Sequence, residues 1–157
     1  MSLTWNQFIN RNVLTTPLEF FAGVIDPDAT IGSFPAVSMT DGADITAYTY
    51  MLIPTNFQAF VSADLLIVAG GTGDMRFSID TTWGGAGTET YNSASDNIAA
   101  GQIAVTLNLI NSIDISAALT GVAAGDLVGI KFIRLAANVL DTVGAVCYMV
   151  GVRLKYV

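Results

Sequence analysis

Residues 125–157 read GDLVGIKFIRLAANVLDTVGAVCYMVGVRLKYV, and this closing stretch decides the fold. Two long runs in it repeat with a period of two, which is the repeat of a β-strand. One face of the first run carries Val128, Ile130, Phe132 and Arg134, and one face of the second carries Val146, Tyr148, Val150, Val152, Leu154 and Tyr156. The stretch therefore predicts two long strands and their connection, with the second strand reaching the end of the sequence.

The same period of two recurs from residue 13 onward, with turn-forming Gly, Asp and Pro between the runs. Further strands are expected at 18–23, 36–40, 44–53, 60–69, 74–80, 102–110 and around 114–116. About eight short strands at even spacing, without a long helical pattern, indicate an all-β protein. We expect an antiparallel β-sandwich of jelly-roll type that forms one domain over residues 13–157.

The composition is poor in charge and rich in apolar residues. Charged residues make up 12% of the chain and apolar residues 52%, with a mean hydropathy of +0.57. The longest apolar runs are about ten residues, well short of the roughly twenty that a membrane-spanning helix needs. We therefore expect no membrane span, and we expect copies of the chain to cover apolar surface on one another, since obligate interfaces resemble a domain core cut in half.

The net charge is −7, and the six basic residues are scattered singly or alternate along expected strands. Binding to nucleic acid depends on clustered Lys and Arg that neutralise phosphates. The sequence therefore disfavours nucleic acid as a partner.

The chain contains no histidine, which is the commonest general base and metal ligand. Asp74 and Asp80 could form a paired-carboxylate site, and Asp26 with Asp28 could contribute ligands to calcium, but turn formation is the simpler interpretation of each. The single cysteine, Cys147, lies in an apolar run and is expected to be buried. We expect no enzymatic activity, no cofactor and no metal.

Residues 1–12 differ from the rest, because Trp5, Phe8 and Ile9 share helical spacing behind a possible cap at Thr4. This segment could fold back over an open end of the sandwich. It could equally be an arm that docks on a neighbouring subunit or a larger shell.

Residues 81–101 are expected to form a long irregular loop, and loops of this length often serve function or assembly. Trp83, Tyr91 and Asn92 in it are candidate ligand-binding residues, because aromatic faces can stack on sugars. The alternative is that the two aromatic rings anchor the loop on the protein's own surface.

Arg134 falls on the apolar face of its expected strand, where an unpaired guanidinium would be costly. Asp141 is the nearest acidic partner in the sequence, and the pair would fix the two closing strands to each other. The alternative is that the strand end bends and lets Arg134 reach water.

The segments 124–134 (AGDLVGIKFIR), 141–142 (DT) and 148–156 (YMVGVRLKY) together resemble the C-terminal strands of β-sandwich domains in bacteriophage virion proteins. Those proteins are head fibres, tail fibres, spikes and decoration proteins. The segments 50–54 (YMLIP) and 73–77 (GDMRF) extend the resemblance over most of residues 48–157.

The resemblance implies a non-enzymatic structural protein on the surface of the virion, commonly a homotrimer, whose partners are itself and capsid or tail proteins. The short segment before the sandwich favours capsid decoration or a short spike head. Two alternatives stay open: a carbohydrate- or receptor-binding module that takes a host surface glycan, and a non-viral self-assembling surface or filament protein.

Overall fold

The computed structural model describes residues 17–157, and these form ten β-strands and one short 3-10 turn. The strands are β1 (Leu18–Gly23), β2 (Ala29–Ile31), β3 (Phe34–Met39), β4 (Ile45–Leu52), β5 (Phe60–Ala69), β6 (Gly73–Gly85), β7 (Ala94–Val105), β8 (Ile110–Asp114), β9 (Asp126–Arg134) and β10 (Cys147–Tyr156). The 3-10 turn η1 (Ser116–Ala118) follows β8. No helix within residues 17–157 is long and apolar enough to cross a membrane.

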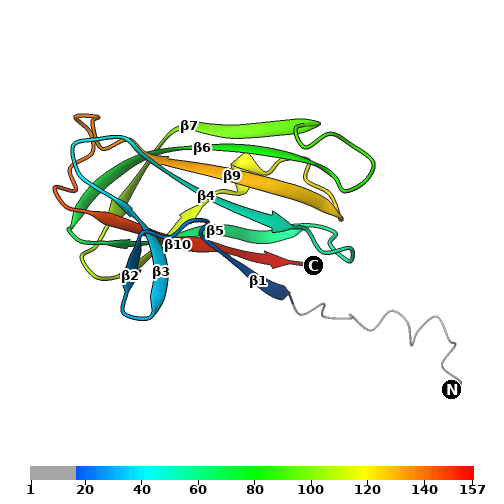
Figure 1. The fold of residues 1–157 in the computed structure, drawn as a ribbon, viewed down its shortest axis with the longest axis horizontal. Coiled ribbons are helices and arrows are strands. Elements are labelled where there is room, and N and C mark those ends of the chain that lie inside the picture. The colour runs from blue at the N-terminus through cyan, green and yellow to red at the C-terminus, as the bar shows by residue number, and fades with distance from the viewer. Residues whose placement is uncertain (1–16) are drawn as a thin grey trace, which may run out of the picture.

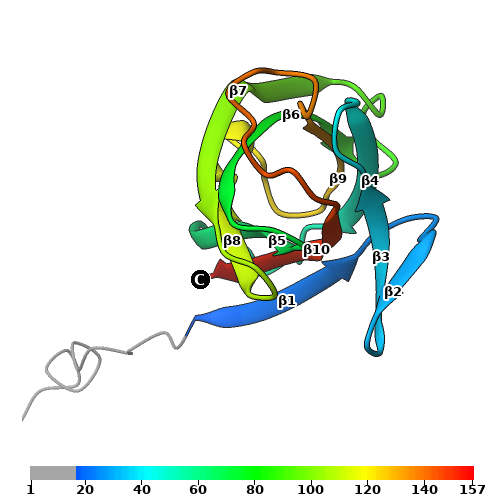
Figure 2. The same ribbon diagram turned by 90° about the vertical axis from the view of Figure 1, so that its left-hand side faces the viewer.

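The strands form two antiparallel sheets that face each other across one core (Figures 1 and 2). The six-stranded sheet has the order β2-β3-β10-β5-β8, with β1 paired to β10, and the four-stranded sheet has the order β4-β9-β6-β7. Without β1 and β2, the eight strands β3 to β10 have the order of a jelly roll, which consists of two Greek keys. The predicted all-β antiparallel sandwich is confirmed.

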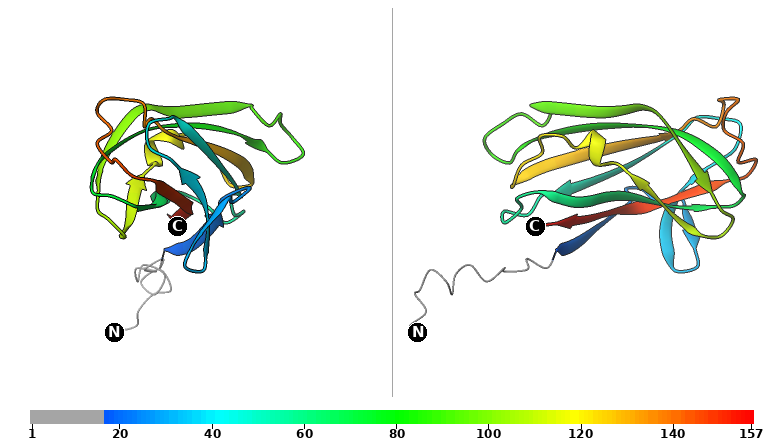
Figure 3. Two further views of the ribbon diagram at one scale, coloured as in Figure 1. Left: turned by 60° about the vertical axis from the view of Figure 1, so that its left-hand side comes forward. Right: turned by 180° about the vertical axis from the view of Figure 1, so that it is seen from behind.

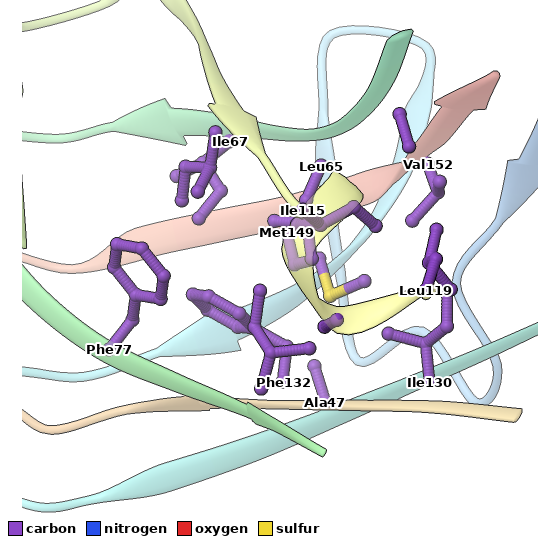
Figure 4. Close-up of a cluster of buried hydrophobic side chains, with 14 of the residues drawn as sticks. Ala47, Leu65, Ile67, Phe77, Ile115, Leu119, Ile130, Phe132, Met149 and Val152 are labelled. Atoms are coloured by element: carbon purple, nitrogen blue, oxygen red, sulfur yellow. The ribbon is translucent and has the colours of Figure 1, made fainter. Parts of the chain in front are cut away.

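The core is made by the inward faces of both sheets. Burial alternates along β5, β6 and β9, as a strand with one face on a core requires. Phe77 and Phe132 stack with their ring centroids 5.8 Å apart, and aliphatic side chains of both sheets surround them (Figure 4). One continuous cluster therefore holds the sandwich together.

The alternation predicted for the last strand is interrupted. Met149 pairs with Ile67 and Gly151 pairs with Leu66, so Val150 is an extra residue in β10. This β-bulge shifts the phase of the strand: Cys147 and Met149 point inward before it, and Val152, Leu154 and Tyr156 point inward after it. Tyr148 and Val150, which were expected on the face of Val152, are on the other side of the sheet.

The long loop predicted for residues 81–101 is wrong for most of its length. β6 continues to Gly85 and β7 begins at Ala94, so only about eight residues connect them. β7 reads ASDNIAAGQIAV, which consists mostly of small and polar residues, and a register shift between Ile98 and Gly101 interrupts its period of two. At Gly101 a side chain would collide with the Phe77 ring, which explains a glycine inside this strand.

The structure differs from the predicted strands in three smaller respects, two after β7 and one before β3. The strand predicted at 102–110 ends at Val105, and of the residues expected near 114–116, Asp114 ends β8 and Ser116 begins η1. The short strand β2, which forms a hairpin with β3, was not predicted. Trp5, Phe8 and Ile9 lie outside the described residues.

Candidate functional site

The predicted pair of aromatic ligand-binding residues is not brought together. Trp83 lies in β6 between its register partners Ala94 and Val128, and only 5% of it is exposed. Tyr91 lies in the β6–β7 connection and is 80% exposed. Because Trp83 is part of the core, it cannot form a stacking platform with Tyr91 and Asn92 on the surface.

Arg134 and Asp141 meet in a fully buried ion pair. The guanidinium donates from Nε to Oδ2 at 3.2 Å and from Nη2 to Oδ1 at 2.9 Å. Its three other N–H groups donate to the backbone carbonyls of Met39, Val143 and Ala145. Burial would lower the pKa of Arg134, but the hydrogen bond and the charge of Asp141 raise that pKa above its ordinary value. Five satisfied donors identify this arginine as a structural junction.

Of the four acidic residues considered for catalysis or calcium, Asp80 and Asp28 contact other residues of the chain. Asp80 forms an exposed ion pair with Lys131 at 3.3 Å. Asp28 accepts hydrogen bonds from the backbone N–H and the hydroxyl of Ser38, both at 2.7 Å, and these bonds lower its pKa. Among residues 17–157, no three His, Cys, Asp or Glu side chains are grouped as metal ligands. The thiol of Cys147 is buried, and burial raises its pKa.

The outer face of the six-stranded sheet is divided into a polar end and an apolar end. At the polar end, Lys155 pairs with Glu19 at 2.8 Å and Arg153 pairs with Asp64 at 2.9 Å. At the apolar end, the outward residues are Phe21 of β1, Leu66 and Val68 of β5, Ile110 of β8 and Val150 of the bulge. An apolar surface with a charged border has the composition of a protein interface.

The apolar end is hollowed into a groove of about 510 Å³, here called the hairpin groove. One wall is the β2–β3 hairpin, which stands away from the sandwich (Figures 2 and 3) and contributes Ile31 and Phe34. Phe34 is 56% exposed and Ile110, on the opposite side, is 62% exposed. The groove is therefore a concave apolar surface open to solvent.

The outer face of the four-stranded sheet carries a second hollow, of about 570 Å³, here called the tyrosine hollow. Tyr48 and Tyr50 of β4 line it together with Gly129 and Lys131 of β9 and with Asp80 and Thr82 of β6. Ile25 and Asp26 close it from the β1–β2 connection, where the Ile25 N–H donates to the Tyr48 carbonyl at 2.9 Å. Its lining is mixed, unlike that of the hairpin groove.

Neither hollow was predicted from the sequence, although β4 carries a signal of the tyrosine hollow. Tyr48, Tyr50 and Leu52 alternate with the buried residues of β4, so the outward face of this strand also carries large aromatic and aliphatic side chains. A strand that covers a core on one face alone has polar residues on the other. Large apolar residues in both phases therefore indicate a second, outward contact surface.

Comparisons of the chain with models of protein families, with curated proteins and with solved structures find no match. The two hollowed faces are the observations from which a function can be inferred.

Proposed function

We propose that this chain is a non-enzymatic structural protein of a virus particle and that it assembles with copies of itself through the hairpin groove. The observation that carries the self-assembly is the exposed apolar surface of that groove. The placement on a virion is supported by the resemblance of residues 48–157 to virion β-sandwich domains. Jelly rolls occur in viral capsid proteins, which is consistent with that placement by analogy of fold alone.

The exposed area of the groove suits an interface between proteins. Phe21, Phe34 and Ile110 line it and are each more than half exposed, while Leu107 and Leu109 flank the lining residue Asn108 and are 48% and 57% exposed. At about 100 Å² each, the three lining side chains offer roughly 300 Å² of apolar surface, and the two leucines add roughly 200 Å² outside the lining. A standard interface takes about 800 Å² from each partner, and monomers seldom expose more than a few hundred Å² in one apolar patch.

A second copy of the chain is the occupant that fits the border of the groove. The adjacent ion pairs Glu19–Lys155 and Asp64–Arg153 place both signs of charge on the same face. Two copies of the chain can therefore place the acidic side chains of one against the basic side chains of the other around the apolar centre. This pairing sets how the two copies are oriented. The resemblance favours a closed trimer, with residues 1–12 as the segment that attaches it to capsid or tail proteins.

Sedimentation velocity of the full chain over a hundredfold range of concentration tests the self-assembly. Three copies of the 16.5 kDa chain give a single species near 50 kDa. A 16.5 kDa monomer throughout, or a mass that grows without limit, contradicts the proposal. The growing mass would instead indicate a filament.

The attachment requires a separate experiment on particles. The protein should copurify with virus particles from the cells that produce it. Deletion of residues 1–12 should release the protein from the particles, and its circular dichroism should still be that of a folded β-sandwich. Full retention of the folded, shortened protein on the particles would contradict the role given to this segment.

A further inference from the structure

The tyrosine hollow has a different chemistry from the hairpin groove, and we propose that it binds a neutral saccharide. Its walls are aromatic, its floor is open and its polar groups are paired beside the aromatic rings. Pockets that recognise small ligands combine these features: apolar walls supply contact area, and a few placed polar groups give orientation. The proposal concerns the opposite sheet from the hairpin groove and does not depend on self-assembly.

The open floor results from Gly129. In the register of the sheet, Gly129 lies directly between Tyr50 of β4 and Thr82 of β6. A Cβ atom at this position would meet nothing closer than the Thr82 hydroxyl, at 3.6 Å. The missing side chain therefore leaves space above the sheet that a ligand can enter beside the Tyr50 ring.

The walls are formed by Tyr48 and Tyr50, which point to the same side of β4 and are 52% and 62% exposed. Residues two positions apart in a strand are about 7 Å apart, so the rings lie at neighbouring positions on the face. An aromatic ring offers a flat apolar surface and a tyrosine adds a hydroxyl at its end. Two such rings in a row can contact the apolar faces of consecutive sugar rings.

The polar groups lie in the same row as Tyr48. Tyr48 pairs in register with Lys131, and Lys131 pairs in register with Asp80. The Lys131 ammonium lies 3.3 Å from the Asp80 carboxylate, and both side chains are partly exposed. The carboxylate accepts hydrogen bonds and the ammonium donates them, so together they match the adjacent hydroxyl groups of a sugar, each of which does both.

The charges define the class of ligand. Among the described residues that line the hollow, two are acidic, Asp26 and Asp80, and one is basic, Lys131, in a chain with a net charge of −7. An anionic sugar or a phosphate would meet net repulsion. A second protein surface of apolar side chains would have to desolvate the Asp80–Lys131 pair, which is costly. A neutral polar ligand with one apolar face avoids both penalties.

The test is binding of the full-length protein to an array of neutral oligosaccharides built from glucose, galactose, mannose and N-acetylglucosamine, with sialylated and sulfated glycans on the same array. Isothermal titration with the best neutral ligand then measures the affinity. We expect Tyr48→Ala and Tyr50→Ala each to weaken binding at least tenfold. Tyr91→Ala is the matched control, since it removes an exposed tyrosine from a loop outside the hollow and should leave affinity unchanged.

Gly129→Val separates loss of binding from loss of folding. Valine favours strands, and its Cβ atom would lie at ordinary contact distances, 3.6 Å from the Thr82 hydroxyl and 3.8 Å from the Thr82 carbonyl oxygen, while its two methyl groups occupy the open floor. We expect unchanged thermal stability and at least a tenfold loss of affinity. Absence of binding to any neutral oligosaccharide, binding to anionic glycans alone, or affinity that Gly129→Val leaves intact would overturn the proposal. A lower mass in solution for Gly129→Val would assign the hollow to a second copy of the chain and would also overturn it.

Discussion

Arg134 and Asp141 form a buried, two-point ion pair that joins the end of β9 to the loop leading into β10. The same carboxylate accepts a hydrogen bond from the Arg76 N–H of β6, at 3.0 Å, and the guanidinium reaches the Met39 carbonyl of β3. The pair therefore connects strands of both sheets at one end of the sandwich. This ion pair explains why an arginine occupies a position on the inward, otherwise apolar face of β9.

Arg134→Met should lower the free energy of unfolding by about 3–5 kcal/mol, because it leaves a buried carboxylate without its partner. The double variant Arg134→Met with Asp141→Leu should recover a large part of that loss, since neither buried charge then remains. Urea unfolding followed by circular dichroism measures both changes. If the double variant loses as much free energy of unfolding as the two single variants lose together, the two residues are not energetically coupled.

Gly151→Ala should detach β1 from β10. Gly151 has a φ of +155°, and a Cβ atom there would collide with the Ala22 carbonyl and the Phe21 ring. We expect a loss of stability of about 1–3 kcal/mol and faster hydrogen exchange in residues 18–23. Gly144→Ala is the control, because nothing lies within 4 Å of its Cβ position. Equal exchange in the two variants would refute the close approach of β1 as the reason for this glycine.

Truncation to alanine should destabilise the protein strongly at Trp83 and hardly at all at Tyr91. Trp83→Ala removes a buried side chain and should cost about 3–5 kcal/mol, whereas Tyr91→Ala should change stability by less than about 0.5 kcal/mol. Thermal and urea unfolding give both values. In a Trp5→Phe background, the remaining tryptophan should emit at short wavelength and resist acrylamide quenching. A strongly quenched Trp83 would restore the interpretation of this residue as a surface platform.

The sequence predicts the fold wherever one face of a strand is uniformly apolar. Val128, Ile130 and Phe132 alternate without interruption, and β9 has the predicted inward face. The bulge at Val150 could not be predicted, because an extra residue in a strand preserves the local alternation on each side and changes only the phase between them. In β7 the small residues around Gly101 are set by the Phe77 ring of the neighbouring strand, which is a tertiary contact.

The candidate surfaces were less predictable than the fold. The pairing of Arg134 with Asp141 was expected because a buried charge needs a partner and Asp141 is the nearest acidic residue in the sequence. The hairpin groove needs β1, the β2–β3 hairpin, β5, β8 and β10 to lie together, and the tyrosine hollow needs the register that places Gly129 beside Tyr50. The alternation of residues within a strand does not show which strands lie side by side, so neither arrangement could be predicted from it.

The most direct test of the central claim compares the mass in solution of Ile110→Ser with that of Leu52→Ser. The two side chains are almost equally exposed, at 62% and 57%, but Ile110 lies in the hairpin groove and Leu52 lies on the outer strand β4 of the other sheet. We predict that Ile110→Ser dissociates the assembly into 16.5 kDa monomers at micromolar concentration, while Leu52→Ser keeps the mass of the unaltered protein. Dissociation by Leu52→Ser with an intact Ile110→Ser assembly would contradict the assignment of the interface.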